Sequence, residues 1–274
     1  MTDPSDEELA ARYGLYASFD SPASPALVKY YGENPADEMA RLLRLHGGPE
    51  SNVLDIGCGA GQTLCWLAPL IGEVWGFEQD TALLASARRR VAAHGLDNVT
   101  LIEGTVAVPA DVARLPEGHF DLAFSQRGPN LNAALLRALR PDAIFIQEFV
   151  GPLNGNHLGE IFGRRPITAG AAGDYRGLLG QYAELDLFPV SVKEYFFESF
   201  FRDAEHLALF LGRGLTLSNW RLPRRPYDPD RDRAALDLYA RYNTTPAGIR
   251  VLAQRYIFAL RRARVHYYPA DSTL

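Results

Sequence analysis

The sequence predicts an α/β fold built on a mainly parallel sheet. Short apolar runs rich in β-branched and aromatic residues alternate with longer segments of helix-forming residues, as is typical of strands joined by helical crossovers. One apolar run ends at Asp55 and continues into a turn that carries Gly57, Gly59 and Gly61, and a second run ends at Glu78. Glycines and acids in these places indicate a ligand that touches the backbone at the carboxyl ends of the strands.

The first part of the chain, residues 1–48, is predicted to form an N-terminal helical segment. A short helix is expected over 5–16 and a loop over 19–25, where Ser-Pro occurs twice. The helix predicted over 35–45 carries apolar residues at helical spacing and acids in its first turn. It ends at the glycines and proline of 47–49.

Residues 49–150 are predicted to form the ligand-binding core, in which strands and helices alternate. Gly72 and Gly95 end two of the helices, and Pro141 limits a third, because glycine and proline terminate helices. The expected strands cover 52–56, 73–78, 99–103, 120–125 and 143–149, and the expected helices cover 61–70, 81–94, 109–114 and 130–139.

The remaining residues, 151–274, are predicted to complete the sheet. Between its last two strands lies a long insertion, about 203–248, which we interpret as a helical cap on the substrate side. This insertion contains the aromatic residues Trp220, Tyr227, Tyr239 and Tyr242. The expected elements are a helix over 174–185, a strand over 190–201, helices over 203–211 and 229–242, and a last strand over 251–261.

The glycines of the turn after the first core strand occupy every second position. The dinucleotide-binding pattern G-x-G-x-x-G, started at Gly57, requires a glycine at position 62, where the chain has Gln62. The stretch from Asp55 to Gly61 instead resembles motif I of the class I S-adenosylmethionine-dependent methyltransferases, D-x-G-x-G-x-G. The resemblance covers about residues 36–150 and continues in 98–104, 115–125 and 139–146, where Asp142 and Ala143 replace two glycines of the family pattern.

This resemblance implies a Rossmann-like three-layer methyltransferase fold, with a mainly parallel seven-stranded sheet whose last strand is antiparallel. It also implies S-adenosyl-L-methionine as the cofactor, with Glu78 placed to accept hydrogen bonds from the ribose hydroxyls. Many family members have Asp at the position of Thr105, so we expect adenine to meet the Thr hydroxyl or backbone groups. The predicted cofactor-binding residues are Asp55, Gly57, Cys58, Gly59, Gly61, Glu78, Gln79, Gly104, Thr105, Ser125 and Gln126.

Methyl transfer to an oxygen or nitrogen atom needs little covalent help, because alignment supplies most of the acceleration. We predict Glu148, at the end of the fifth strand, as the catalytic base and Arg127, after the fourth strand, as the group that binds an anionic acceptor. Ion pairing is the alternative role for both side chains, and His157 is a weaker candidate base. The two cysteines, Cys58 and Cys65, lie in the glycine turn and the next helix, so we predict neither a cysteine nucleophile nor a metal site.

The predicted acceptor is a small molecule, partly apolar, rather than a nucleic acid. The formal net charge is −5, which disfavours a polyanionic partner. The segment 125–129 lacks the N/D-P-P-Y/F motif of enzymes that methylate planar amines, and the predicted cap carries aromatic residues rather than a basic stripe. Two alternatives stay open, an RNA methyltransferase and a non-catalytic protein that binds S-adenosylmethionine.

The composition also predicts the cellular location of the protein. No apolar run reaches the ~18 residues that a membrane-spanning helix needs. Residues 1–8 are acidic and polar, unlike a secretory signal, and two cysteines give no disulfide framework. We therefore expect a cytoplasmic protein without a membrane partner, and the sequence makes no prediction of its oligomeric state.

Overall fold

The computed structural model describes residues 22–166, 175–213, 217 and 221–263. The helix expected over 5–16 lies outside these residues. The elements in chain order are β1 (Leu27–Tyr30), α2 (Pro35–His46), β2 (Asn52–Ile56), α3 (Gln62–Leu67), the 3-10 helix η2 (Ala68–Leu70), β3 (Glu73–Glu78), α4 (Thr81–Ala93), β4 (Val99–Glu103), α5 (Pro109–Val112), β5 (Phe120–Gln126), α6 (Ala133–Leu136), β6 (Leu139–Val150), α7 (Asn156–Ile161), β7 (Arg165–Pro166), α8 (Tyr175–Ala183), β8 (Leu187–Phe201), α9 (Ala204–Arg213), β9 (Arg221–Leu222), α10 (Pro229–Asn243), β10 (Thr244–Thr245) and β11 (Gly248–Arg262).

Nine strands of the described residues form one sheet in the order β1-β8-β11-β6-β5-β2-β3-β4, with β10 beside β11. The five strands from β6 to β4 are parallel, and β11 is antiparallel to both β6 and β8. This arrangement confirms the predicted α/β fold with an antiparallel last strand. The sheet is larger than the predicted seven strands, because β1 adds to the edge of β8 and β10 pairs with β11.

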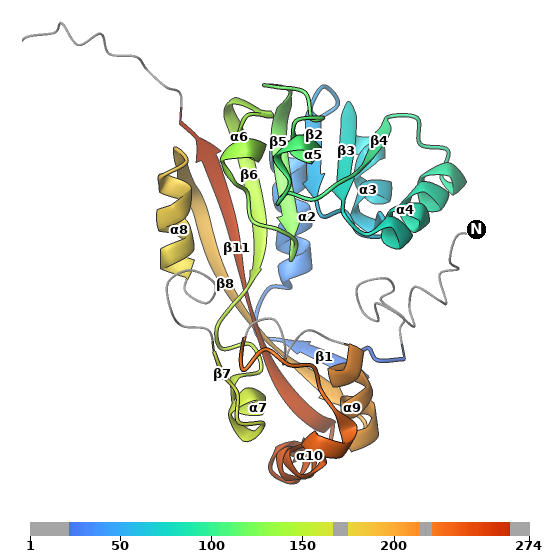
Figure 1. Cartoon of the computed structure of the whole chain (residues 1–274), viewed down its shortest axis with the longest axis vertical. Helices are drawn as coiled ribbons and strands as arrows, with labels where there is room; N and C mark the ends of the chain where they lie inside the picture. Colours follow the sequence, from blue (N-terminus) through green and yellow to red (C-terminus); the bar gives the residue numbers. More distant parts are fainter. Residues whose placement is uncertain (1–21, 167–174, 214–216, 218–220, 264–274) are drawn as a thin grey trace, which may run out of the picture.

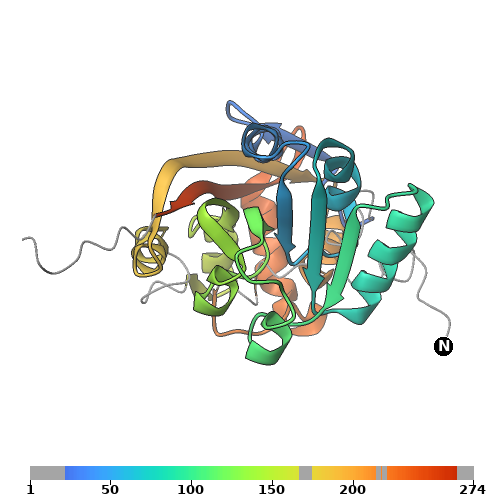
Figure 2. The same cartoon turned by 90° about the horizontal axis from the view of Figure 1, so that it is seen from above.

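The helices cover both faces of the parallel strands, which gives three layers (Figures 1 and 2). Successive residues of β2 point to opposite faces. On one face, Leu54 and Ile56 pack in a core with residues of α5, α6 and α8. On the other face, Val53 packs with residues of α2, α3 and α4. These two cores hold the carboxyl ends of β2, β3 and β5 in fixed positions.

Local signals explain where the core helices begin. Asn34 caps α2 through its side chain, which accepts from the backbone N–H of Ala36. Asp80 caps α4 in the same way and accepts from Ala82 and Leu83. Such caps satisfy N–H groups that lack a partner within the helix. Both helices therefore start where the sequence predicted them to start.

The connection between β5 and β6 differs from the prediction. The expected helix over 130–139 is only one turn, α6, and β6 begins at Leu139 instead of residue 143. Leu139 pairs with Phe120, and a register shift before Leu122 accommodates the extra residues of β6. Asp142 takes a left-handed backbone conformation, with φ of 69°. Strand pairing at this point overrides the local preference for helix.

The strands β8 and β11 are long enough to extend beyond the parallel core. Their pairing runs from Leu187 beside Arg262 to Phe201 beside Ile249. At the far end they carry a second group of elements, β1, α7, α9 and α10 (Figure 1). We call this group the lobe. It has its own apolar cluster, in which Phe201 and Ile249 pack with side chains from α7, α9 and α10.

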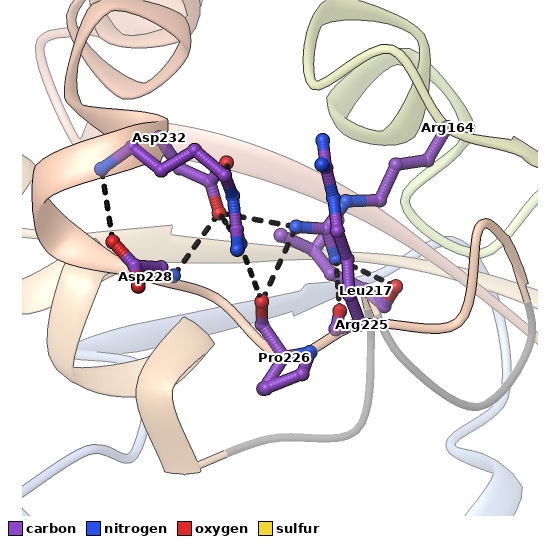
Figure 3. Close-up of polar contacts among 7 residues, drawn as sticks. Arg164, Leu217, Arg225, Pro226, Asp228 and Asp232 are labelled. Atoms are coloured by element: carbon purple, nitrogen blue, oxygen red, sulfur yellow. Dashed lines mark hydrogen bonds and ion pairs between the residues drawn. The ribbon is translucent and has the colours of Figure 1, made fainter.

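A buried arginine fastens the chain within the lobe (Figure 3). The Arg164 side chain is fully buried, and its Nη1 donates to the carbonyl oxygens of Leu217 at 2.8 Å and Arg225 at 2.6 Å. Its Nη2 donates to Asp232 Oδ2, on α10, at 3.1 Å. Burial lowers the pKa of Arg164. Arg164 thus joins the segment before β7 to α10 and to the chain that precedes it.

No helix in the described part of the chain is long and apolar enough to span a membrane. The predicted division of the chain at residues 48 and 150 stays a prediction. The insertion expected over 203–248 contributes α9 and α10 to the lobe, and α7 and β1 join them from other parts of the sequence.

Candidate active site

The turn after β2 combines left-handed backbone with open space. Gly57, Gly59 and Gly61 have φ values of 86°, 55° and 79°, a region that residues with a side chain rarely adopt. A Cβ added at Gly59 would meet no protein atom within 4 Å, whereas one at Gly57 would lie 2.9 Å from Pro129 Cδ. Gly59 therefore leaves room for a ligand, and Gly57 lets the turn after β5 approach.

Glu78, at the end of β3, ties this turn to the next helix. Its Oε2 accepts from the backbone N–H of Gly59 at 2.9 Å, and its Oε1 accepts from the N–H of Asp80 at 2.9 Å. The carboxylate is buried, at 8% exposed. Hydrogen bonds of this kind to a charged acceptor are stronger than neutral ones. Glu78 thus both shapes the turn and lines the space beside it.

Two buried acids approach each other where the strands end. Asp55 is 3% exposed, and burial raises its pKa well above its ordinary value, with a further contribution from the charge of Glu78. Burial also raises the pKa of the Cys58 thiol, so this cysteine is held as the unreactive thiol. A cationic group placed here would relieve the cost of ionising Asp55.

A cavity of about 330 Å³ opens at this point. Nine of the eleven predicted cofactor-binding residues lie in its wall, namely Asp55, Gly57, Cys58, Gly59, Glu78, Gln79, Gly104, Thr105 and Gln126. Further wall residues that were not predicted to bind the cofactor are Gln62, Thr63, Phe77, Leu83, Val106, Gly128 and Pro129. Gln62, Val106 and Gly128 directly follow a predicted residue in the chain, and Phe77 directly precedes one. For these four residues, their position beside a predicted residue was the available signal.

The other two predicted residues lie outside this wall for identifiable reasons. Ser125 is fully buried, and its hydroxyl donates to the carbonyl oxygen of Pro129 at 2.8 Å. Gly61 packs against α4, where an added Cβ would lie 3.0 Å from the Cβ of Ala87. Both residues support the neighbouring turns rather than face the cavity.

A second cavity, of about 270 Å³, adjoins the first. Gln126 and Arg127 belong to the walls of both. The rest of the second wall comes from β1, the start of α2, β6, β8, α9 and β11, and from the loops that carry Pro25 and Asn154. We call the first space the glycine-turn cavity and the second the inter-lobe cavity, because the latter lies between the parallel core and the lobe.

Glu148 and Arg127, the predicted catalytic residues, meet in the inter-lobe cavity. Glu148 is 6% exposed. Its Oε1 lies 3.6 Å from Arg127 Nε and 3.4 Å from Arg255 Nε. Arg127 has a left-handed φ of 59°, and its N–H donates to the carbonyl oxygen of Glu148 at 3.1 Å. Backbone strain of this kind is often found at functional sites.

These ion pairs bear on the role of Glu148. The Glu148 carboxylate is shared between two guanidinium groups, and ion pairing is the alternative role that the sequence analysis gave for Glu148. The carboxylate therefore holds Arg127 and Arg255 in place. Arg255 comes from β11, and no local pattern in the sequence connected it with Glu148. His157 lies elsewhere, at a cavity within the lobe, with its ring centroid 5.8 Å from that of Tyr239.

A buried polar network supports the turn that carries Arg127. The hydroxyl of Tyr182, on α8, donates to Gln147 Oε1. Gln147 Nε2 in turn donates to Asn130 Oδ1 at 2.7 Å. Gln147 and Tyr182 are 1% exposed, and burial raises the pKa of Tyr182. The network fixes the position of the turn relative to β6.

No cluster of three or more His, Cys, Asp or Glu side chains that could hold a metal ion occurs among the residues that the structure describes.

Residues 53–142 match the family described as "Methyltransferase domain". The protein-L-isoaspartate O-methyltransferase of Nitrobacter winogradskyi is 32% identical over 124 residues, which cover 45% of this chain and 55% of that protein. For the curated relatives of this name, the matched part is 28% to 55% of their length. The chain therefore spans about half the length of these relatives, or less.

Solved structures resemble the chain over most of its length. A protein of unknown function from Deinococcus radiodurans R1 aligns with a TM-score of 0.60 and 18% identity, covering 93% of this chain and 98% of that one. A candidate methyltransferase from Bacillus halodurans C-125 aligns with a TM-score of 0.59 and 12% identity, covering 83% and 100%. At these identities the likeness shows the fold.

Proposed function

Because the chain contains a methyltransferase domain of the class I, Rossmann-like fold, we propose that it binds S-adenosyl-L-methionine and transfers the methyl group to a small molecule. The observation that carries this proposal is the pair of adjoining cavities. One is bounded by the glycine turn, Asp55 and Glu78, and the other is bounded by both the core and the lobe. Two substrates that exchange a group need such adjacent sites.

The residues of the glycine-turn cavity fit this cofactor. Gly59 leaves open space where a side chain would stand, and the buried carboxyl group of Asp55 favours a cationic group nearby. Glu78 would hold the ribose and Asp55 the amino group of the methionine part, with Thr105 and Gln79 near the adenine. When bound, the cofactor supplies a methyl group on a positively charged sulfur, which is already reactive toward nucleophiles.

The chain's own residues then align the acceptor and exclude water. Gln126 and Arg127 stand between the two cavities, where an acceptor would face the methyl group. The inter-lobe wall includes the aromatic side chains of Tyr30, Phe197 and Phe210. Such a wall suits a small, partly apolar molecule better than a polyanionic nucleic acid. We also propose a cytoplasmic setting, which the two free cysteines favour.

The test is a transfer assay with methyl-labelled S-adenosylmethionine and a cell extract separated into small-molecule, RNA and protein fractions. We expect label in the small-molecule fraction, and we expect Gly59→Val to abolish it, because the branched side chain would fill the cavity. Label found only in RNA would favour the RNA methyltransferase. Tight binding of the cofactor without transfer to any fraction would favour the non-catalytic alternative.

A further inference from the structure

Within the part of the chain that the structure describes, neither cavity wall provides a side chain that is available to remove a proton from the methyl acceptor. The side chains in the two walls that ordinarily act as bases at neutral pH are the carboxylates of Asp55, Glu78 and Glu148, and neither wall contains a histidine among the described residues. Glu78 accepts two backbone hydrogen bonds, and Glu148 is paired with two arginines. Asp55 lines the glycine-turn cavity and does not belong to the wall of the inter-lobe cavity. An acceptor in the inter-lobe cavity must therefore be nucleophilic without losing a proton to the protein.

The charge of the inter-lobe cavity favours an anion. Its wall contains the two guanidinium groups of Arg127 and Arg255 but the single carboxylate of Glu148, which leaves one positive charge in excess. The Arg127 side chain is 32% exposed, and its one ion pair within the described residues is the 3.6 Å contact to Glu148. A guanidinium group carries five donors in a planar fork that matches a carboxylate. Arg127 thus keeps donors for a ligand at the junction of the two cavities.

The remainder of the wall is largely apolar. Tyr30 comes from β1, Phe197 from β8 and Phe210 from α9, with Val251 of β11 beside them. A volume of about 270 Å³ is at the small end of ligand sites. The cavity therefore suits an aromatic or branched aliphatic group attached to a single anionic group.

We propose that the methyl acceptor is a small carboxylic acid with an aromatic or branched apolar body, and that the carboxylate oxygen is methylated. This inference rests on the proposed function and specifies its substrate. A lone pair of the carboxylate oxygen forms the new oxygen–carbon bond as the bond between methyl carbon and sulfur breaks, and that electron pair stays on sulfur. The products are a neutral ester and a neutral thioether, and no proton moves, so no base is needed.

The first test examines the chemistry of the product. Label transferred from methyl-labelled S-adenosylmethionine to the small-molecule fraction is treated with mild alkali, which hydrolyses methyl esters and leaves methyl ethers and methylamines intact. We expect most of the label to appear as volatile methanol. Label that resists alkali overturns the carboxylate assignment but leaves methyl transfer standing. Absence of any transfer, with S-adenosylhomocysteine still bound, contradicts the proposed function instead.

The second test measures binding and does not depend on activity. Phenylacetate and its neutral analogue phenylacetamide are titrated by calorimetry into protein saturated with S-adenosylhomocysteine. We expect about tenfold tighter binding of the carboxylate, equal to about 1.4 kcal/mol. The preference should fall to about twofold or less in Arg127→Gln, and Arg127→Lys should retain part of it, because the charge remains but the fork is lost.

The matched control is Arg241→Gln, on the exposed side of α10, outside the walls of both cavities. It should keep the full preference of the wild-type protein. Far-ultraviolet circular dichroism checks that each variant is folded. Equal binding of the two probes to the wild type, no binding of either at 10 mM, or an unchanged preference in Arg127→Gln would each overturn the proposal; the 10 mM ceiling corresponds to about 3 kcal/mol of binding free energy.

Discussion

The buried carboxyl group of Asp55 lowers the stability of the free protein when it is ionised, and the same charge favours binding of the cofactor. Its pKa in the folded protein is raised, first by burial and then by Glu78, above the ordinary value of 3.8. The folded state therefore holds the proton more tightly than the unfolded state does. The contribution of this group to stability is complete below the unfolded pKa and is lost as the pH rises through the raised folded pKa.

Asp55→Asn should accordingly stabilise the free protein at neutral pH, because the amide never ionises. The gain should shrink as the pH falls toward 3.8 and should come with weaker binding of S-adenosylmethionine. Urea unfolding of both proteins across this pH range measures the difference. A difference that is the same at every pH would show that ionisation of Asp55 does not contribute.

Glu78 is expected to act mainly on the ligand. Glu78→Ala removes the acceptor of the Gly59 and Asp80 N–H groups and should weaken binding of S-adenosylhomocysteine by ~1–3 kcal/mol. The matched control is Glu73→Ala on the same strand, since Glu73 pairs with His119 at 2.9 Å, away from the cavity. Equal losses of affinity in the two variants would argue against a direct contact from Glu78.

At the scale of elements, Arg164 joins the parts of the lobe. Arg164→Met should lower the free energy of unfolding by about 3 kcal/mol, because it leaves buried carbonyl oxygens and Asp232 without their partner. Arg231 also contacts Asp232, at 2.6 Å, which limits the loss. Affinity for S-adenosylhomocysteine, measured on folded protein, should stay within about twofold. A larger change would mean that the lobe shapes the glycine-turn cavity.

The turn between β5 and α6 depends on the network of Gln147. Gln147→Leu removes the partners of the Tyr182 hydroxyl and of Asn130 and should cost ~1–3 kcal/mol of stability. Because the turn carries Arg127, the KM for the methyl acceptor should rise more than the KM for S-adenosylmethionine. Tyr182→Phe should act in the same direction but less strongly, because the link to Asn130 remains. Steady-state kinetics that show neither KM changed would confine the network to a structural role.

At the scale of the whole molecule, the elements that depend on signals local in the sequence were predictable. The order of helices and strands in the core was predicted from three kinds of signal. These are the glycines at turns, the capping residues such as Asp80 and the apolar runs of the strands. The strand β1 was not expected, because its four residues are mostly exposed and gain their order from pairing with β8. The helix α7 was also missed, because its six residues follow Gly155 in a segment rich in turn-forming residues.

The candidate site was predictable where one motif forms it, and less so where distant segments meet. The glycine-turn cavity is bounded by residues that follow β2, β3, β4 and β5, and strand ends of a parallel sheet meet at one edge. The inter-lobe cavity needs β8 and β11 to extend past the core. The pairing of Glu148 with Arg255 joins residues more than a hundred positions apart, a separation beyond any local pattern.

The central claim is that the glycine-turn cavity binds S-adenosylmethionine, and calorimetric titration of the purified protein with S-adenosylhomocysteine tests it most directly. Nicotinamide adenine dinucleotide is titrated in parallel, because the dinucleotide-binding proteins have a related glycine turn. We expect a Kd of about 1 μM for S-adenosylhomocysteine, or roughly 8 kcal/mol, and no detectable binding of the dinucleotide. Tight binding of the dinucleotide without binding of S-adenosylhomocysteine would contradict the assignment of the site.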